Sequence, residues 1–124
     1  MPRALVVEDS TVMRALICRA LAGAGVETFS AVDGVDALES LEGRPPPDLV
    51  VCDLHMPRMG GIELISALRT RGFTNGIILL SGEDDAGVVA QARAAGATRR
   101  LPKPFTVPDL IAAVKSEIDK QTAA

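Results

Sequence analysis

Short runs of hydrophobic residues alternate along this chain with longer segments whose hydrophobic residues recur at helical spacing. Three of the runs are continuous, at residues 4–7, 49–52 and 77–80, and two weaker ones lie at 26–31 and 97–101. Continuous runs of this length, rich in valine, isoleucine and leucine, are typical of strands buried on both faces of a parallel sheet. The pattern therefore predicts five strands.

Five segments with helical spacing follow the predicted strands. Their hydrophobic positions fall within residues 13–24, 35–41, 64–68, 88–95 and 107–118. Ser10 or Thr11 is expected to cap the first helix and Asp33 the second, and Thr106-x-x-Asp109 is a capping box before the last. Strict alternation of strands and helices predicts an α/β fold with a doubly wound parallel sheet.

The two weaker strands carry charged residues, which indicates that they lie at the edges of the sheet. Glu27 lies in the second strand, and Arg99 and Arg100 lie in the fifth. The continuous runs then occupy the centre, which matches the flavodoxin-like strand order 2-1-3-4-5. In this order, ligands bind beyond the carboxyl ends of the first and third strands, where the strand order reverses.

Composition limits the class of protein. A chain of 124 residues, 48% hydrophobic, has the length of one domain, and with three Phe and no Trp or Tyr its core is aliphatic. No hydrophobic run is long enough to span a bilayer, and no secretory signal pattern precedes the first strand. Cys18 and Cys52 are expected to be reduced thiols. These features predict a cytoplasmic protein with no membrane insertion.

Charge is unevenly distributed. The net charge of −3 argues against direct nucleic-acid binding by charge alone. Residues 1–85 carry seven Lys/Arg and thirteen Asp/Glu, whereas residues 86–124 carry six and three. The basic excess of the second part includes Arg93, Arg99, Arg100 and Lys115. These side chains form either a docking face for an acidic partner or a set of scattered, solvated charges.

Four of the predicted strands lead into residues that can interact with a phosphoryl group. These residues are Glu8 and Asp9 after the first strand, Asp53 after the third, Ser81 after the fourth and Lys103 after the fifth. Because the carboxyl ends of parallel strands meet at one edge, we expect them to converge. Each alone has an ordinary explanation, as a helix-terminus acid, a turn residue or a solvated lysine. Those explanations do not account for the placement of all five residues at the ends of predicted strands.

The chemistry of such a cluster follows from its charge. Carboxylates about 5 Å apart repel by roughly 3 kcal/mol per pair at an effective dielectric constant near 20. The site therefore takes up protons or binds a cation, and Mg²⁺ prefers a few carboxylates, several waters and an incoming phosphate. Asp53 would then attack phosphorus as a carboxylate nucleophile. Lys103 and Ser81 would contact the phosphoryl oxygens.

Four fragments resemble the receiver domain of response regulators, and the resemblance covers essentially the whole chain, residues 1–124. They lie at residues 7–10, 53–61, 80–82 and 103–105, and they include Asp-x-x-Met-Pro-x-Met-Gly-Gly and Lys-Pro-Phe. The resemblance implies two-component phosphorelay signalling, in which a histidine kinase or histidine phosphotransfer protein phosphorylates an aspartate in the presence of Mg²⁺. It also implies a single domain without an output domain.

The resemblance assigns roles to the site residues. It implies that Asp53 is the phosphoacceptor and that Asp9 and Asp53 ligate Mg²⁺ directly. Glu8 would act mainly through water, and the backbone carbonyl of His55 would supply another ligand. A cis peptide bond before Pro104 is also implied, which would direct the preceding lysine toward the site.

The chain departs from the family at Arg100, three positions before Lys103, where the family has an aromatic residue. With no tyrosine in the chain, the usual hydroxyl-plus-aromatic switch cannot operate as such. Either Arg100 moves instead, or the output runs through Ser81 and the loop at residues 82–85. We predict that Arg100→Ala alters partner binding and leaves phosphorylation intact.

Residues 8–14 are similar to those of single-domain chemotaxis regulators. This implies a phosphorylation-dependent downstream protein that binds the fourth helix, fifth strand and fifth helix, where the basic excess lies. A receiver module taken from a longer regulator or hybrid kinase would have a similar sequence.

Three rival functions remain. Aspartate-nucleophile phosphatases keep a second acid two residues after the nucleophile, where this chain has His55. A flavin-binding protein would place phosphate against Glu8 and Asp9, which repel it unless a metal intervenes. A phosphate-independent scaffold of the same fold would not need all five site residues. We therefore expect a signalling domain that at most catalyses its own phosphorylation and dephosphorylation, and not a conventional enzyme.

Overall fold

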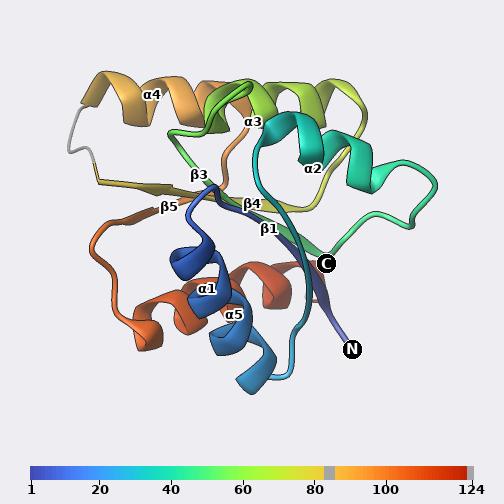
Figure 1. Cartoon of the computed structure of the whole chain (residues 1–124), viewed down its shortest axis with the longest axis vertical. Coiled ribbons are helices and arrows are strands. Elements are labelled where there is room, and N and C mark those ends of the chain that lie inside the picture. The colour runs from blue at the N-terminus through green and yellow to red at the C-terminus, as the bar shows by residue number, and fades with distance from the viewer. Residues whose placement is uncertain (83–85, 123–124) are drawn as a thin grey trace.

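A computed structural model describes residues 1–82 and 86–122, and these form a five-stranded parallel sheet covered by helices on both faces (Figure 1). The strands are β1 (Arg3–Val7), β2 (Glu27–Ala31), β3 (Leu49–Asp53), β4 (Gly76–Ser81) and β5 (Arg99–Pro102). Their order is β2-β1-β3-β4-β5, with every neighbouring pair parallel. The predicted flavodoxin-like order is therefore confirmed, and β2 and β5, the two strands expected at the edges, lie there.

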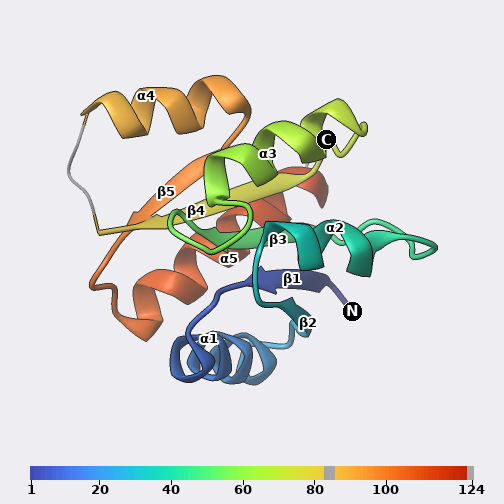
Figure 2. The same cartoon turned by 45° about the horizontal axis from the view of Figure 1, so that its top comes forward.

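The helices are α1 (Thr11–Gly23), α2 (Gly34–Leu41), α3 (Gly61–Thr70), α4 (Ala86–Ala95) and α5 (Val107–Thr122). Figures 1 and 2 show α1 and α5 on one face of the sheet and α2, α3 and α4 on the other. This is the doubly wound arrangement that strict alternation predicts. Among the described residues, none of the helices combines the length and the hydrophobicity needed to cross a membrane.

Two aliphatic cores, one on each face, hold the sheet between its helices. Leu5 and Val7 of β1 pack with residues of α2, α3 and α4, whereas Ala4 and Val6 pack with residues of α1 and α5. All four are fully buried, and burying a valine or leucine side chain stabilises the fold by roughly 1.5–3 kcal/mol. The three phenylalanines pack only at the margins of these cores.

Side-chain caps mark the ends of the connections into α1 and α5. The Ser10 hydroxyl accepts a hydrogen bond from the backbone N–H of Met13 (3.2 Å), so Ser10 and not Thr11 caps α1. The Thr106 hydroxyl accepts in the same way from the N–H of Asp109 (3.2 Å). Because α1 begins immediately after Ser10, only two residues separate the end of β1 from the cap. Those two residues are Glu8 and Asp9.

Candidate functional site

Three carboxylates meet at the carboxyl-terminal edge of the sheet. Glu8 and Asp9 follow β1, and Asp53 ends β3, the strand that pairs with β1. One carboxylate oxygen of each residue lies within 4.8 Å of the other two. Glu8 and Asp53 are buried, whereas Asp9 is exposed. The cluster is thus closed on the side of the sheet and open to solvent at Asp9, as a site for a partly hydrated cation must be.

Lys103 supplies a positive charge to the cluster. Its Nζ lies 2.7 Å from Oδ1 of Asp53 and 3.7 Å from Oε1 of Glu8. Its backbone N–H donates to the carbonyl of Ser81 (2.9 Å), and the Lys103–Pro104 peptide bond is cis, as the resemblance implied. One ammonium group against three carboxylates leaves the cluster with an excess of negative charge.

The carboxylate of Glu8 is buried and incompletely hydrogen-bonded. Its Oε2 atom is buried and has no hydrogen-bond partner among the described residues. Burial, reinforced by the charge of Asp53, raises the pKa of Glu8 to about 7, although Lys103 acts in the opposite direction. A buried carboxylate oxygen without a partner is costly. The site therefore favours a proton or a cation at this position.

The backbone at the end of β3 leaves no room for a side chain at the start of α3. A Cβ atom on Gly61 would lie 2.4 Å from the carbonyl oxygen of Asp53. The N–H of Gly61 donates to the carbonyl of Leu54 (2.9 Å) and closes the base of the β3–α3 loop. The second glycine of the Asp-x-x-Met-Pro-x-Met-Gly-Gly motif is thus required by a close approach of two backbone segments.

Ser81 ends β4 and is buried beside the cluster, because Asp53 pairs with Leu80 in the sheet. Its backbone carbonyl also accepts a hydrogen bond from Nη2 of Arg100 (3.4 Å). Arg100 therefore reaches the strand end that carries Ser81. The alternative output route through residues 82–85 falls mostly on residues 83–85, which lie outside the described residues.

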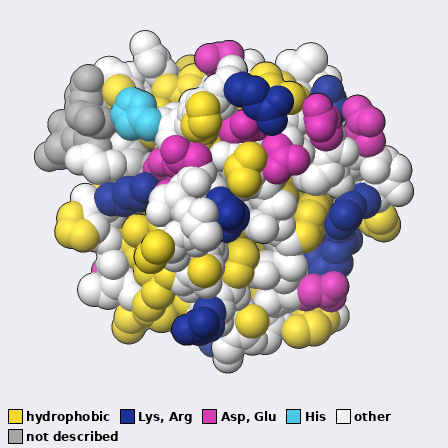
Figure 3. Space-filling model, viewed as in Figure 1, with side chains coloured by type: hydrophobic (Ala, Val, Ile, Leu, Met, Phe, Trp, Pro, Cys, Tyr) yellow, Lys and Arg dark blue, Asp and Glu magenta, His cyan; other side chains and the backbone are white. Residues whose placement is uncertain are grey.

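His55 is exposed on the β3–α3 loop. Together with Asp9 and Glu63 it lines a surface hollow of about 400 Å³ beside the acidic cluster. Figure 3 shows acidic side chains gathered on the upper half of this face, over the ends of β1 and β3 and the beginning of α2. The hollow gives solvent and ligands access to the exposed side of the site.

The basic residues expected to form a partner face have different surroundings. Arg93 and Lys115 are exposed on α4 and α5. Arg99 instead donates from Nε to Oε2 of Glu117 (3.3 Å) and from Nη2 to the hydroxyl of Ser116 (3.0 Å). Its charge is therefore largely engaged within the molecule, and the partner role of this face stays a prediction.

Comparison with known proteins identifies the family. Residues 4–115 match the family model of the response regulator receiver domain. The chain belongs to this family. Receiver domains are signalling domains of two-component systems, and their partners are histidine kinases or phosphotransfer proteins.

Curated relatives of this receiver domain are longer proteins. It is 40% identical over 100 residues to the Regulator of RpoS of Escherichia coli (strain K12), covering 81% of this chain and 29% of that protein. It is 36% identical over 114 residues to the response regulator MprA of Mycobacterium leprae (strain TN), covering 92% and 50%. The chain thus spans at most half the length of these relatives.

Solved receiver structures have the same fold. The Vibrio cholerae chemotaxis protein CheY4 superposes with a TM-score of 0.89 at 30% identity, covering 94% of this chain and 98% of that one. The receiver domain of the Francisella response regulator 1452 gives 0.90 at 28% identity, covering 98% and 99%.

The structure of the receiver domain also shows an ion pair that sequence reasoning missed. Asp33, expected only as a helix cap, accepts two hydrogen bonds from the guanidinium group of Arg58. The two residues are 25 positions apart, and no hydrophobic period or motif links them. Only the packing of α2 against the β3–α3 loop brings them together.

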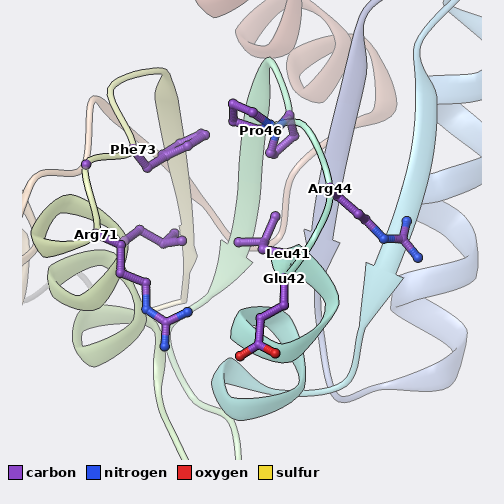
Figure 4. Close-up of a pocket in the computed structure, with 9 residues that line it drawn as sticks. Leu41, Glu42, Arg44, Pro46, Arg71 and Phe73 are labelled. Atoms are coloured by element: carbon purple, nitrogen blue, oxygen red, sulfur yellow. The ribbon is translucent and has the colours of Figure 1, made fainter.

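A separate cavity of about 260 Å³ lies at the opposite end of the sheet, between the segment before β3 and the segment before β4 (Figure 4). Leu41, Pro46, Phe73 and Arg44 are among the residues that line it, and the Arg44 side chain extends toward β2. The Arg44 guanidinium lies over the ring of Phe29, 5.0 Å from its centroid. This cavity shares no residue with the acidic cluster.

Proposed function

We propose that this receiver domain accepts a phosphoryl group on Asp53 from a histidine kinase or histidine phosphotransfer protein, with Mg²⁺ as the required cation. Asp9 and Asp53 would ligate the ion directly, Glu8 mainly through water, and the backbone carbonyl of His55 would add another ligand. The observation that carries this proposal is the meeting of three carboxylates around the ammonium group of Lys103. One of them has a buried oxygen with no hydrogen-bond partner among the described residues.

The donor set fits Mg²⁺ chemically. All side-chain donors are carboxylate oxygens, which are the ligands of a hard divalent cation. Asp9 is exposed and borders the open hollow, so water and a phosphoryl oxygen have room to complete an octahedral shell. When bound, the ion would neutralise the phosphoryl oxygens and let the anionic donor approach the carboxylates.

The protein's own residues would then carry the transfer. A carboxylate oxygen of Asp53 forms the new bond to phosphorus, and the bond from phosphorus to the donor's histidine nitrogen breaks, leaving its electron pair on the imidazole. The ammonium group of Lys103 lies 2.7 Å from Asp53, and it would form an ion pair with a phosphoryl oxygen once the group is transferred. The Ser81 hydroxyl would donate to another phosphoryl oxygen.

The surface beside the site suits a protein as the phosphodonor. Val12 and Leu16 of α1 are 81% and 43% exposed, and Val107 at the start of α5 is 37% exposed. Leu16, Lys103 and Phe105 also line a hollow of about 330 Å³. Figure 3 shows hydrophobic side chains gathered at the lower left, the part of the view where Figure 1 places α1 and the start of α5. Apolar surface next to a charged site is typical of a protein contact.

The output would be a change in the binding of a downstream protein, with α4, β5 and α5 as the contact face. Exposed Arg93 and Lys115 favour an acidic partner there. A chemotaxis-type output is one form of this proposal, supported by the similarity to the Vibrio cholerae chemotaxis protein. A net charge of −3 favours a protein partner over nucleic acid.

Intact mass after incubation with acetyl phosphate tests the proposal. We expect one added phosphoryl group that requires Mg²⁺ and is lost in Asp53→Asn, because an amide cannot act as the nucleophile. Asp119→Asn, which changes an exposed carboxylate on α5, is the matched control and should keep the label.

Labelling without Mg²⁺, or labelling that persists in Asp53→Asn, would contradict the proposed chemistry. Steady release of phosphate from an unrelated phosphomonoester would favour an aspartate-nucleophile phosphatase instead.

A further inference from the structure

An ion pair spans the two loops on either side of β1. Asp33 follows β2, and Arg58 lies in the loop after β3, while β1 lies between these two strands in the sheet. Nε of Arg58 lies 2.8 Å from Oδ2 of Asp33, and Nη2 lies 3.1 Å from Oδ1. The contact is therefore bidentate, the geometry in which an arginine fixes the orientation of a carboxylate as well as its position.

Asp33 is fully engaged at this position. It is only 3% exposed, and its Oδ1 atom also accepts from the backbone N–H of Asp36 (2.8 Å) as the cap of α2. The hydrogen bond from Arg58 holds the pKa of Asp33 below its ordinary value, against the effect of burial. A buried carboxylate with this many donors is rigidly held.

The loop that carries Arg58 packs closely against the beginning of α2. The carbonyl of Met59 accepts from the N–H of Gly34 (3.2 Å), and a Cβ atom on Gly34 would lie 2.5 Å from Cγ of Met59. Figures 1 and 2 both show this loop beside the first turn of α2. Arg58 has φ of +64°, a left-handed conformation that a residue with a side chain adopts only where its surroundings require it.

The same loop forms one side of the acidic cluster. It leaves Asp53 directly, and His55 lies three residues before Arg58. Its base is closed by the hydrogen bond from Gly61 to Leu54. Its far end is held by the ion pair with Asp33 and by the hydrogen bond from Gly34 to Met59. Removing a group that orients a metal ligand typically lowers metal affinity about 10- to 100-fold.

We propose that the Asp33–Arg58 ion pair positions the metal site, by holding the β3–α3 loop so that the backbone carbonyl of His55 faces the space between Asp9 and Asp53. This inference rests on the proposed function. It makes Arg58 a positioning residue that acts through the loop backbone, and it explains why a left-handed residue here is an arginine and not a glycine.

Calorimetric titration with Mg²⁺ tests this inference in two variants of the full chain. Arg58→Gly removes the ion pair but suits the left-handed backbone, and Asp33→Asn removes the charge but keeps a good helix cap. We expect Mg²⁺ affinity to fall roughly three- to tenfold in both, less than the 10–100-fold typical of groups that contact a metal ligand directly. Labelling by acetyl phosphate should recover toward the wild-type rate at saturating Mg²⁺.

Lys120→Ala is the matched control. Lys120 is 61% exposed and pairs with the buried Glu117, as Arg58 is 56% exposed and pairs with the buried Asp33, but it lies on α5 away from the loop. It should leave Mg²⁺ affinity unchanged. Wild-type affinity in Arg58→Gly and Asp33→Asn overturns the inference, and so does an equal loss in Lys120→Ala. If wild-type protein itself neither binds Mg²⁺ nor becomes labelled, the proposed function fails, and this inference fails with it.

Discussion

Two glutamates, one near each end of the sheet, are equally buried but differ in their hydrogen-bond partners. Glu8 and Glu117 are both 2% exposed. Glu117 accepts hydrogen bonds from the Thr98 hydroxyl, from Nζ of Lys120 (2.9 Å) and from Nε of Arg99 (3.3 Å). Glu8 has an ammonium group at 3.7 Å and one oxygen with no hydrogen-bond partner in the described part of the chain.

The pKa values of the two side chains shift in opposite directions. Burial raises the pKa of each, but at Glu117 the hydrogen bonds from Thr98 and Lys120 outweigh burial and the pKa is lowered. At Glu8 the neighbouring carboxylate of Asp53 adds to burial and the pKa is raised. Removing a buried acid from its partners is strongly destabilising, whereas a buried acid with too few donors is a candidate for ligand binding.

Removing the charge of each glutamate should separate these two roles. We expect Glu117→Gln to lower the free energy of unfolding by roughly 2–4 kcal/mol, because Arg99 and Lys120 lose their buried partner. Glu8→Gln should cost less than about 1 kcal/mol in the absence of Mg²⁺, because it removes a poorly compensated charge. Urea unfolding with a chelator present measures both. Equal losses of unfolding free energy in the two variants would show that the two glutamates do not differ in their roles.

The pH dependence of stability sharpens the comparison. Because the folded-state pKa of Glu8 lies near 7 and above its ordinary value of 4.5, the folded protein binds more protons than the unfolded chain between these limits. Stability contributed by Glu8 is therefore present at low pH and lost as pH rises through 7, by about 1–3 kcal/mol. Urea midpoints at pH 5 and 8, compared between wild type and Glu8→Gln, measure this loss. Saturating Mg²⁺ should reduce this loss of stability. If the urea midpoints of wild type and Glu8→Gln changed equally with pH, the prediction would be contradicted.

The smallest effect is expected at Arg100. Its guanidinium donates a long hydrogen bond of 3.4 Å to the carbonyl of Ser81. Arg100→Ala should therefore change the rate of labelling by acetyl phosphate by less than about twofold, since a long hydrogen bond to a carbonyl contributes little. Time courses of intact mass with saturating Mg²⁺ measure the rate. A loss as complete as that of Asp53→Asn would instead make Arg100 part of the acidic site.

Most of the fold follows from the sequence because its signals are local. The continuous runs of β1, β3 and β4 predict central strands, and charged residues predict β2 and β5 at the edges, as the structure has them. The candidate site follows for the same reason, because each of its residues ends a strand or comes just after one. Topology then brings strand ends together.

Contacts that depend on how distant elements pack could not be predicted. The Arg58–Asp33 pair joins two loops, and Arg99 is engaged by Glu117 from α5, 18 residues away. Counting Arg99 as free basic surface overlooked this partner, because a net charge reveals no pairing. The choice of Ser10 over Thr11 as the cap of α1 likewise depends on backbone geometry that either residue allows.

The aliphatic character of the two cores has a practical consequence for spectroscopy. With no tryptophan or tyrosine in the chain, the protein has almost no ultraviolet absorption at 280 nm and no intrinsic indole emission. A single tryptophan in place of Phe105, which is half-buried in the hollow beside Lys103, would fluoresce against an empty background. The proposed Mg²⁺ binding and phosphoryl transfer at this end of the sheet could then be followed in real time by one probe.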